Sequence, residues 1–380
     1  MSLAVQAKAQ KKQPVSMQWK MAAILPADDG KLQSTGFAGP VTGIHNTIFF
    51  IGGGANFPDA MPWNGGKKKY YDKIVAYSTK HHQLGLINKS FHLPSGIAYA
   101  ACCTTPGGIL YAGGENENGI SNKVWLMQWD EAAQNIIFKN LPDLPIPVSN
   151  AAATLVGNTI YFAGGETTTA ASDQFIALDL QNSSGGWKKL TRIPHPVSHA
   201  VLTAPATKKS NQIYITGGRK KNSNGISDLY NAVYIYDITN NSWQKKKSLP
   251  YALCAGTGIA AGSSGILMFG GDNGTTFHKV ETLIAAINSE KDETKKQELV
   301  RQKNKLQSEH PGFSKEVLLY NTLTDTWKTV GDIPFDTPVT TTAVKWGKDV
   351  LIPSGEIKAG VRTAQILEGK ILNSKNGRKN

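Results

Sequence analysis

The chain has 380 residues, of which 38 are glycine, and it carries a formal net charge of +13 with 18% charged residues. Its three cysteines lack the even number and spacing of a disulfide scaffold, and no apolar run reaches the ~20 residues of a membrane-spanning helix. The positive charge favours an anionic partner. Because no nucleic-acid-binding motif accompanies it, neither nucleic acid nor membrane is an expected partner.

The two ends of the chain are expected to lie outside the folded domain. The start MSL is typical of a vector-derived tag, and AVQAKAQ resembles what remains beside a removed signal peptide. Residues 1–16 are therefore expected to be a tag or disordered segment, and the protein is expected to be periplasmic or exported. The basic segment 373–380 is expected to be a disordered tail, which leaves residues 17–372 as a single domain.

Apolar strands that end in glycine recur along the chain. Glycines 113, 164, 217 and 270 are 51 to 53 residues apart, and the longer spacings before and after them contain insertions. A repeat of roughly 50 residues with four strands predicts a kelch-type propeller blade. The six glycine strands are IFFIGGG (48–54), ILYAGGE (109–115), IYFAGGE (160–166), IYITGGR (213–219), ILMFGGD (266–272) and VLIPSGE (350–356).

The outer strands of the repeats predict how the ring closes. An aromatic residue begins a short outer strand after five of the glycine strands, whereas the sixth such aromatic, Trp19, lies in SMQWKMAAILP at the start of the chain. This N-terminal strand is therefore predicted to complete the blade built from residues 339–370, which leaves no exposed sheet edge. The predicted fold class is all-β, a six-bladed kelch-type β-propeller. Two stacked β-sandwiches would not explain six similar copies with one of them split. The five other aromatics are Phe91, Phe138, Trp187, Trp243 and Trp327.

Two insertions interrupt the repeats. The first, residues 55–73, is rich in glycine, proline, aromatic residues and lysine. The second spans residues 279–314, where Val280, Leu283 and Ile287 recur at helical spacing, so a helical insertion is predicted in the fifth blade. This second insertion is consistent both with a surface elaboration and with a lid or wall over a functional site.

Ionisable residues follow five of the six glycine strands. Because the glycine strand is the second from the axis of such a blade, the loops after it should surround one mouth of the central channel, where a ligand site is expected. Any single one of these charges could instead bond to its own turn. Taken together, the ionisable residues favour a site for a polar ligand. The residues that follow the glycines are Gly54, Glu115, Glu166, Arg219, Asp272 and Glu356.

Signatures of other chemistry are absent from the sequence. It contains no HExxH, paired CxxC, GxxxxGK[ST] or GxSxG motif, so neither a metal nor a cofactor is expected. His199, near the start of an inner strand, is equally consistent with facing the channel and with packing in the core.

Two segments carry a resemblance to a known family. SGEIKAGVRT (354–363) resembles the G-E-x-K-x-G-x-R-T segment of bacterial N-acetylneuraminate epimerases, or sialic acid mutarotases, which are six-bladed kelch propellers. GFAGPVTGIHNTIFFIGGGANF (36–57) is similar to their G-F-A-G segment. In the better-known members the Glu-to-Arg segment precedes the other, whereas here it follows. The blade order therefore resembles that of a cyclically permuted mutarotase group, and a permutation leaves the ring intact.

The resemblance implies an isomerase that interconverts the α and β anomers of N-acetylneuraminate, a small acidic sugar. It implies Glu356 as the acid/base catalyst, and Arg362 suits the sugar carboxylate because a guanidinium binds it with two parallel hydrogen bonds. The alternative is a non-catalytic kelch propeller that binds an acidic glycan or a protein. The sequence does not predict an oligomeric state. Further candidates for substrate binding are Asn56, Glu115, Glu166, Arg219, Asp272 and Lys358.

Overall fold

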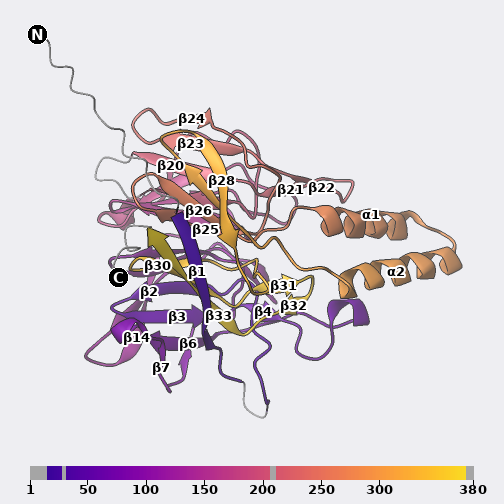
Figure 1. Ribbon diagram of the computed structural model, residues 1–380, viewed down its shortest axis with the longest axis horizontal. Coiled ribbons are helices and arrows are strands. Elements are labelled where there is room, and N and C mark those ends of the chain that lie inside the picture. The colour runs from indigo at the N-terminus through magenta and orange to yellow at the C-terminus, as the bar shows by residue number, and fades with distance from the viewer. Residues whose placement is uncertain (1–14, 28–30, 206–210, 374–380) are drawn as a thin grey trace, which may run out of the picture.

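The computed structural model describes residues 15–27, 31–205 and 211–373, which form a six-bladed β-propeller (Figure 1). Most of the expected N-terminal tag and almost all of the expected basic tail lie outside the described residues. We number the blades 1 to 6 by the order of their glycine strands. None of the helices in the described ranges is long and apolar enough to cross a membrane.

The six blades share one strand order. Within each blade, the strand nearest the axis pairs with the glycine strand, which pairs with a third strand and then a strand at the rim, all antiparallel. In blade 1, two short strands share the rim position. The blades are β2 (Val41–His45), β3 (Ile48–Gly52), β6 (Lys73–Ser78), β7 (Gly85–Leu86) and β8 (Phe91–His92); β9 (Ala101–Thr105), β10 (Gly108–Ala112), β13 (Val124–Asp130) and β14 (Asn135–Leu141); β15 (Ala152–Val156), β16 (Thr159–Ala163), β17 (Phe175–Asp179) and β18 (Lys188–Lys189); β19 (Val201–Thr203), β20 (Gln212–Thr216), β23 (Val233–Asp237) and β24 (Ser242–Lys245); β25 (Thr257–Ala261), β26 (Gly265–Phe269), β27 (Glu316–Asn321) and β28 (Thr326–Asp332); and β29 (Val344–Trp346), β30 (Asp349–Pro353), β33 (Gln365–Asn373) and β1 (Val15–Ile24).

Blade 6 contains both ends of the described chain. Strand β1 pairs antiparallel with β33, with Trp19 opposite Gly369, and β33 pairs in turn with β30. The Trp19 ring lies edge-on to Phe269 of blade 5, with ring centroids 5.6 Å apart. The seam of the propeller is therefore a complete four-stranded sheet that packs on its neighbour.

The hydrophobic core lies between neighbouring blades. Strand β3, with the sequence IFFIG, is buried at all five positions, because both faces of its sheet pack against other sheets. Phe50 of this strand lies 6.0 Å from Trp129 of blade 2 between ring centroids. Continuous apolar runs such as this one, rather than alternating patterns, are what a sheet covered on both faces requires.

Two residues with left-handed backbone end each glycine strand. In blade 2 these are Gly113 (φ 69°) and Gly114 (φ 94°), and a Cβ atom on Gly113 would lie only 2.3 Å from the carbonyl oxygen of Val148. Glycine is therefore required for packing as well as for conformation. In blade 1 the equivalent pair is Gly53 and Gly54, so the residue that takes the place of the ionisable ones is Ala55, which corrects the assignment of Gly54.

A closed ring of hydrogen bonds surrounds the axis where the inner strands begin. Six residues there have φ between 50° and 63°, and each backbone N–H donates to the carbonyl of the equivalent residue in the preceding blade, at 2.6 to 3.0 Å. The last of these bonds runs from Gly39 of blade 1 to Thr340 of blade 6, which closes the circuit. We call this set the axial ring. Its members are Gly39, Tyr99, Asn150, His199, Ala255 and Thr340.

One face of the propeller carries small hairpins and two helices. The hairpins follow the glycine strands of blades 1, 2, 4 and 6, and α1 (Thr275–Ser289) and α2 (Glu293–Ser308) extend from blade 5 (Figure 1). The helices begin four residues before the predicted insertion and end before its limit at 314. The hairpin strands are β4 (Ala55–Asn56) with β5 (Lys69–Tyr70), β11 (Glu115–Asn116) with β12 (Gly119–Ile120), β21 (Arg219–Lys221) with β22 (Ser227–Leu229), and β31 (Glu356–Lys358) with β32 (Val361–Arg362).

Candidate functional site

A cavity of about 610 Å³ lies at the mouth of the channel on the face that carries the hairpins and helices. This volume is within the range of small-molecule sites. Tyr99, Asn150 and His199 of the axial ring line it, and both insertions contribute, with Phe57 and Pro62 from the first and residues of α1 and α2 from the second. The insertions therefore form part of the cavity wall and are not elaborations remote from it.

The charged residues that follow the glycine strands all line this cavity. Each pairs through a backbone bridge with the residue just before an axial-ring residue, as Glu166 does with Ser149 and Glu356 with Val339. The ring and the charged residues are thus held in fixed relation by backbone hydrogen bonds. The five residues are Glu115, Glu166, Arg219, Asp272 and Glu356.

Glu356 and Arg362 lie opposite each other in the β31–β32 hairpin. Gly360 (φ 78°) makes the turn and donates its N–H to Glu356 Oε1 at 2.6 Å, while Glu356 Oε2 lies 3.7 Å from Arg362 Nη2. A Cβ atom on Gly360 would lie 2.6 Å from Pro62, so the first insertion packs directly on this turn. Because of the hairpin, a six-residue separation becomes a cross-strand pair that faces the cavity.

Arg362 has hydrogen-bonding capacity that the described residues leave unused. Its side chain is only 4% exposed and its guanidinium carbon lies 4.8 Å from the centre of the Phe57 ring. Both Nε and Nη1 are buried without a partner among the described residues. Since a buried donor without an acceptor is costly, this geometry favours an anionic ligand, and a carboxylate matches a guanidinium best.

The two segments that resemble the epimerase family lie side by side, although they are far apart in sequence. Phe37 donates its N–H to Ser354 Oγ at 2.8 Å, and Gly355 donates its own to the Phe37 carbonyl at 2.7 Å. A Cβ atom on Gly36 would lie 1.9 Å from the carbonyl oxygen of Thr363. The first segment therefore supports the hairpin that carries Glu356 and Arg362.

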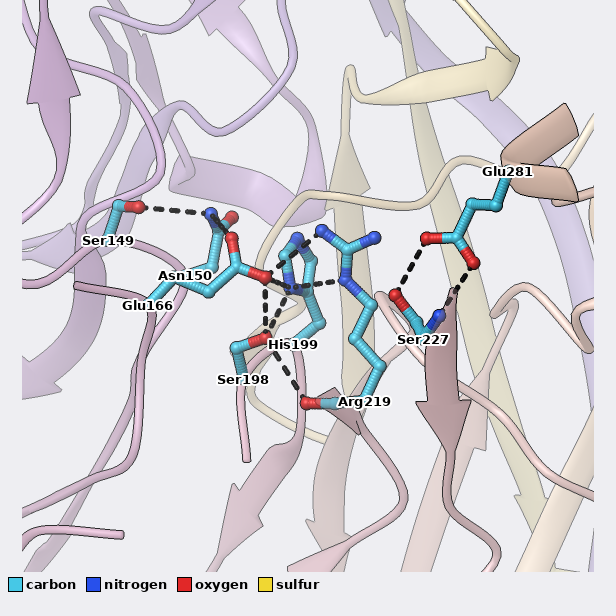
Figure 2. A network of polar contacts seen from close by, with 8 residues as sticks. All are labelled: Ser149, Asn150, Glu166, Ser198, His199, Arg219, Ser227 and Glu281. Carbon is cyan, nitrogen blue, oxygen red and sulfur yellow. Dashed lines mark hydrogen bonds and ion pairs between the residues drawn. The ribbon is translucent and has the colours of Figure 1, made fainter. Parts of the chain in front are cut away.

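A second polar network lies on blades 3 and 4 (Figure 2). Glu166 Oε1 accepts hydrogen bonds from Ser198 Oγ at 2.9 Å and from Arg219 Nη2 at 3.1 Å. Although burial raises the pKa of Glu166, the charge of Arg219 and the hydrogen bonds from Ser198 and Arg219 hold that pKa below its usual value. The Arg219 guanidinium lies 5.0 Å from the Phe277 ring of α1. Arg219 donates a hydrogen bond to its carboxylate partner at 3.1 Å, whereas Arg362 lies 3.7 Å from Glu356, beyond hydrogen-bond distance.

His199 is neutral in this network. Arg219 Nε–H donates to His199 Nδ1 at 3.4 Å, so the ring proton lies on Nε2. Burial and the charge of Arg219 lower the pKa of His199 to about 3, against the attraction of Glu166.

The folded protein is therefore expected to lose stability as the pH falls below 6.5. The unfolded chain binds a proton at His199 near its ordinary pKa and the folded chain does not, so the free energy of unfolding should fall by about 1.4 kcal/mol at pH 5.5 for this group alone. Denaturant titrations at pH 7.5 and 5.5 measure this change. In His199→Asn, which keeps an acceptor for Arg219, the pH dependence should be smaller by that amount. An equal pH dependence in the two proteins would contradict the assignment.

Glu115 and Asp272 have partners of their own. Glu115 Oε1 accepts from Lys68 Nζ at 3.0 Å and from the Tyr70 hydroxyl at 2.7 Å, which ties the first insertion to blade 2. Asp272 Oδ1 accepts the Gly274 N–H at 2.8 Å, just before α1, and burial raises the pKa of its carboxyl. Asp272 thus bonds to its own turn, whereas Glu115 holds a segment that is distant in the sequence.

Helix α1 is fixed to blade 4 by a buried carboxylate (Figure 2). Glu281, 8% exposed, accepts hydrogen bonds from the Ser227 N–H at 2.8 Å and from Ser227 Oγ at 2.7 Å. Residues of α2 also meet the first insertion, where Asn304 Nδ2 donates to the Trp63 carbonyl at 2.9 Å. The two insertions therefore touch each other.

Two candidate residues do not line the cavity. Asn56 is buried, and its amide donates to Thr35 and Gly36 and accepts from the Tyr71 hydroxyl, so it has a structural role in this fold. Lys358 is not among the described residues around the cavity, because a bulge between Glu356 and Lys358 breaks the alternation that would place both on one face.

Sequence reasoning missed several cavity residues. Phe57, Phe277 and His310 come from the insertions, and Tyr99 from the axial ring. The left-handed backbone positions of the ring could have been noticed only by aligning the six inner strands. Among the described residues, no group of three or more His, Cys, Asp or Glu side chains is placed to hold a metal ion.

The fold and the cavity together define a six-bladed β-propeller with a charged pocket at one mouth of its channel. Residues 141–379 match the family model of N-acetylneuraminate epimerase. This match covers more than half of the sequence, and the chain belongs to the N-acetylneuraminate epimerase family.

Curated relatives support the same family. The N-acetylneuraminate epimerase of Haemophilus influenzae (strain 86-028NP) is 31% identical over 231 residues, which is 60% of this chain and 59% of that protein. The enzyme of the same name from Brucella melitensis is 30% identical over 240 residues, and that from Salmonella typhimurium is 28% identical over 237 residues, each covering 62% of this chain. The matches span 59% of the length of these relatives.

Proposed function

We propose that this protein is a mutarotase that interconverts the α and β anomers of N-acetylneuraminate or a closely related acidic sugar. The observation that carries the proposal is the buried Arg362 guanidinium, two of whose nitrogen atoms have no partner in the described part of the chain, beside the Glu356 carboxylate in one cavity. Arg362 binds the sugar carboxylate, and Glu356 moves the proton. Arg219 is less suited to hold the carboxylate, because it already donates a hydrogen bond to Glu166, whereas Arg362 Nε and Nη1 have no partner among the described residues.

The proposed reaction needs one proton and no other reactant. Glu356 accepts the proton of the anomeric hydroxyl, the bond between the anomeric carbon and the ring oxygen breaks, and a carbonyl forms at that carbon. The proton then passes from Glu356 to the former ring oxygen. Rotation about the adjacent carbon–carbon bond presents the other face of the carbonyl, and the same steps in reverse close the ring. Glu356 ends each cycle as it began, as a carboxylate.

The segment order supports a permuted arrangement of the family's blades. The family match begins at residue 141, and the segment 36–57 lies outside it. An alignment that keeps the order of residues can match only one of the two parts of a chain that a circular permutation has exchanged. Because the two segments meet in space through Phe37 and Gly355, such a rearrangement would leave the hairpin of Glu356 and its support in place.

The alternative is a propeller that binds an acidic glycan or a protein without catalysis. It is favoured by the Glu356 carboxylate, which already accepts from Gly360 N–H and lies near Arg362, so that its position could be structural.

Anomer equilibration followed by proton NMR separates the two functions. Protein added to freshly dissolved crystalline N-acetylneuraminic acid should shorten the time to anomeric equilibrium. A protein that only binds would perturb the sugar signals at an unchanged rate of equilibration, and this result would refute the mutarotase proposal.

The Arg362→Lys variant should chiefly weaken binding of the acidic sugar. It keeps the positive charge but loses the two parallel hydrogen bonds, so the apparent KM should rise more than kcat falls. A neutral sugar without the carboxylate serves as the matched ligand, and its binding should change little. Equal binding of the acidic sugar to both proteins would exclude Arg362 as the carboxylate site.

A further inference from the structure

The turn that follows α2 lies between the ends of blades 5 and 6. Ser314 donates its N–H to the carbonyl of Gly271, the residue before Asp272, at 3.1 Å. On the other side, a Cβ atom on Gly312 would lie 3.6 Å from the carbonyl oxygen of Ile357, the residue after Glu356. The second insertion therefore brings its last turn against both neighbouring cavity residues.

His310 in this turn lines the cavity and is 4% exposed. Its Nδ1 atom accepts the Gly312 N–H at 3.0 Å, so in the neutral ring the proton lies on Nε2. Nε2 makes no hydrogen bond to the described residues. Burial lowers the pKa of His310 despite the nearby charges of Asp272 and Glu356, which keeps the ring neutral near pH 7.

We propose that His310 is a further catalytic residue, which donates a hydrogen bond from Nε2 to the sugar ring oxygen as the ring opens. This inference rests on the proposed mutarotase function. Negative charge develops on the ring oxygen when its bond to the anomeric carbon breaks, and a preorganised donor in a buried site stabilises that charge. His310 keeps its proton throughout, and the proton that moves is the one carried by Glu356.

Two substitutions separate a donor from a structural turn residue. The short amide of His310→Asn can reach the position of Nδ1 and accept from Gly312, but it places no donor at the position of Nε2. The longer amide of His310→Gln can place an N–H there and loses the contact with Gly312. If His310 is a donor, His310→Gln should be more active than His310→Asn. If His310 only holds the turn, His310→Asn should be the more active of the two.

We expect His310→Asn to lower kcat for anomer equilibration by about 10²-fold, or to the spontaneous rate if that is reached first, with little change in KM. His310→Gln should retain most of the parental rate even if its melting temperature falls. If His310→Asn fails to fold, His310→Gln decides: a parental rate supports the donor role, and a lost rate with an intact thermal melt overturns it.

Two further results would overturn the inference. One is His310→Asn equilibrating the sugar as fast as the parent protein. The other is His310→Asn at the parental rate with His310→Gln slow, which would assign His310 to the turn. A parent protein that itself shows only the spontaneous rate would instead reject the mutarotase function, and this inference with it.

Discussion

Glu356→Gln is expected to reduce anomer equilibration towards the spontaneous rate. The amide keeps the size of the side chain and can still accept the Gly360 N–H, but it cannot take a proton from the anomeric hydroxyl. Removal of a general acid/base typically costs on the order of 10²–10⁴-fold in rate. The measured loss cannot exceed the whole advantage of the enzyme over the uncatalysed reaction, and N-acetylneuraminate should still bind because Arg362 remains.

A matched exposed glutamate controls for the change of charge. Glu298 lies on the surface of α2, where it pairs with Arg301, and Glu298→Gln should equilibrate the sugar at the parental rate. Proton NMR gives the equilibration rate of each protein, and titration calorimetry gives the binding of the sugar. If Glu356→Gln were as fast as the parent, Glu356 would be structural and the binding-only function would become the better explanation.

Deletion of residues 1–25 is expected to destabilise the whole propeller. It removes β1, which pairs along its length with β33, and it leaves β33 as an unprotected sheet edge. It also removes Trp19 from its contact with Phe269 of blade 5. We expect the thermal melt to shift strongly downwards or the protein to aggregate.

Two comparisons test this result. Deletion of residues 1–14 alone keeps β1 and should leave the melting temperature unchanged. Trp19→Ala keeps the strand but loses the ring contact, and it should cost about 3 kcal/mol. A protein without residues 1–25 that melts as the parent does would show that the ring needs no closure by β1.

The blades were predictable because their pattern is local. Glycine pairs, apolar strands and aromatic rim residues recur every 51 to 53 residues in the middle of the chain, and each feature reflects the same packing requirement. Blade 1 has three successive glycines, so the sequence alone did not show which two of them form the left-handed pair. Only the structure identifies Gly53 and Gly54 as the left-handed pair and Ala55 as the residue that follows.

The site was predictable where it follows the repeat and not where it depends on contacts between segments that are separated in the sequence. Glu356 and Arg362 lie on one hairpin, and the charges after the glycines share one cavity. In contrast, Asn56 has the same place in its own hairpin as Asn116 in β11, and only its buried bonds to Gly36 and Tyr71 reveal its structural role. His310 gave no signal, because its position results from how α2 returns to the ring.

The axial ring also determines whether the backbone at the floor of the cavity attracts a charged ligand. Each peptide group carries a dipole, and in a helix these dipoles add along the axis to give a terminus that attracts anions. In the axial ring the donors all point the same way around a closed circle, so their dipoles cancel. The backbone there offers a sugar carboxylate no net attraction. Discrimination between an acidic and a neutral sugar must therefore come from side chains, and chiefly from Arg362, whose Nε and Nη1 have no hydrogen-bond partner among the described residues.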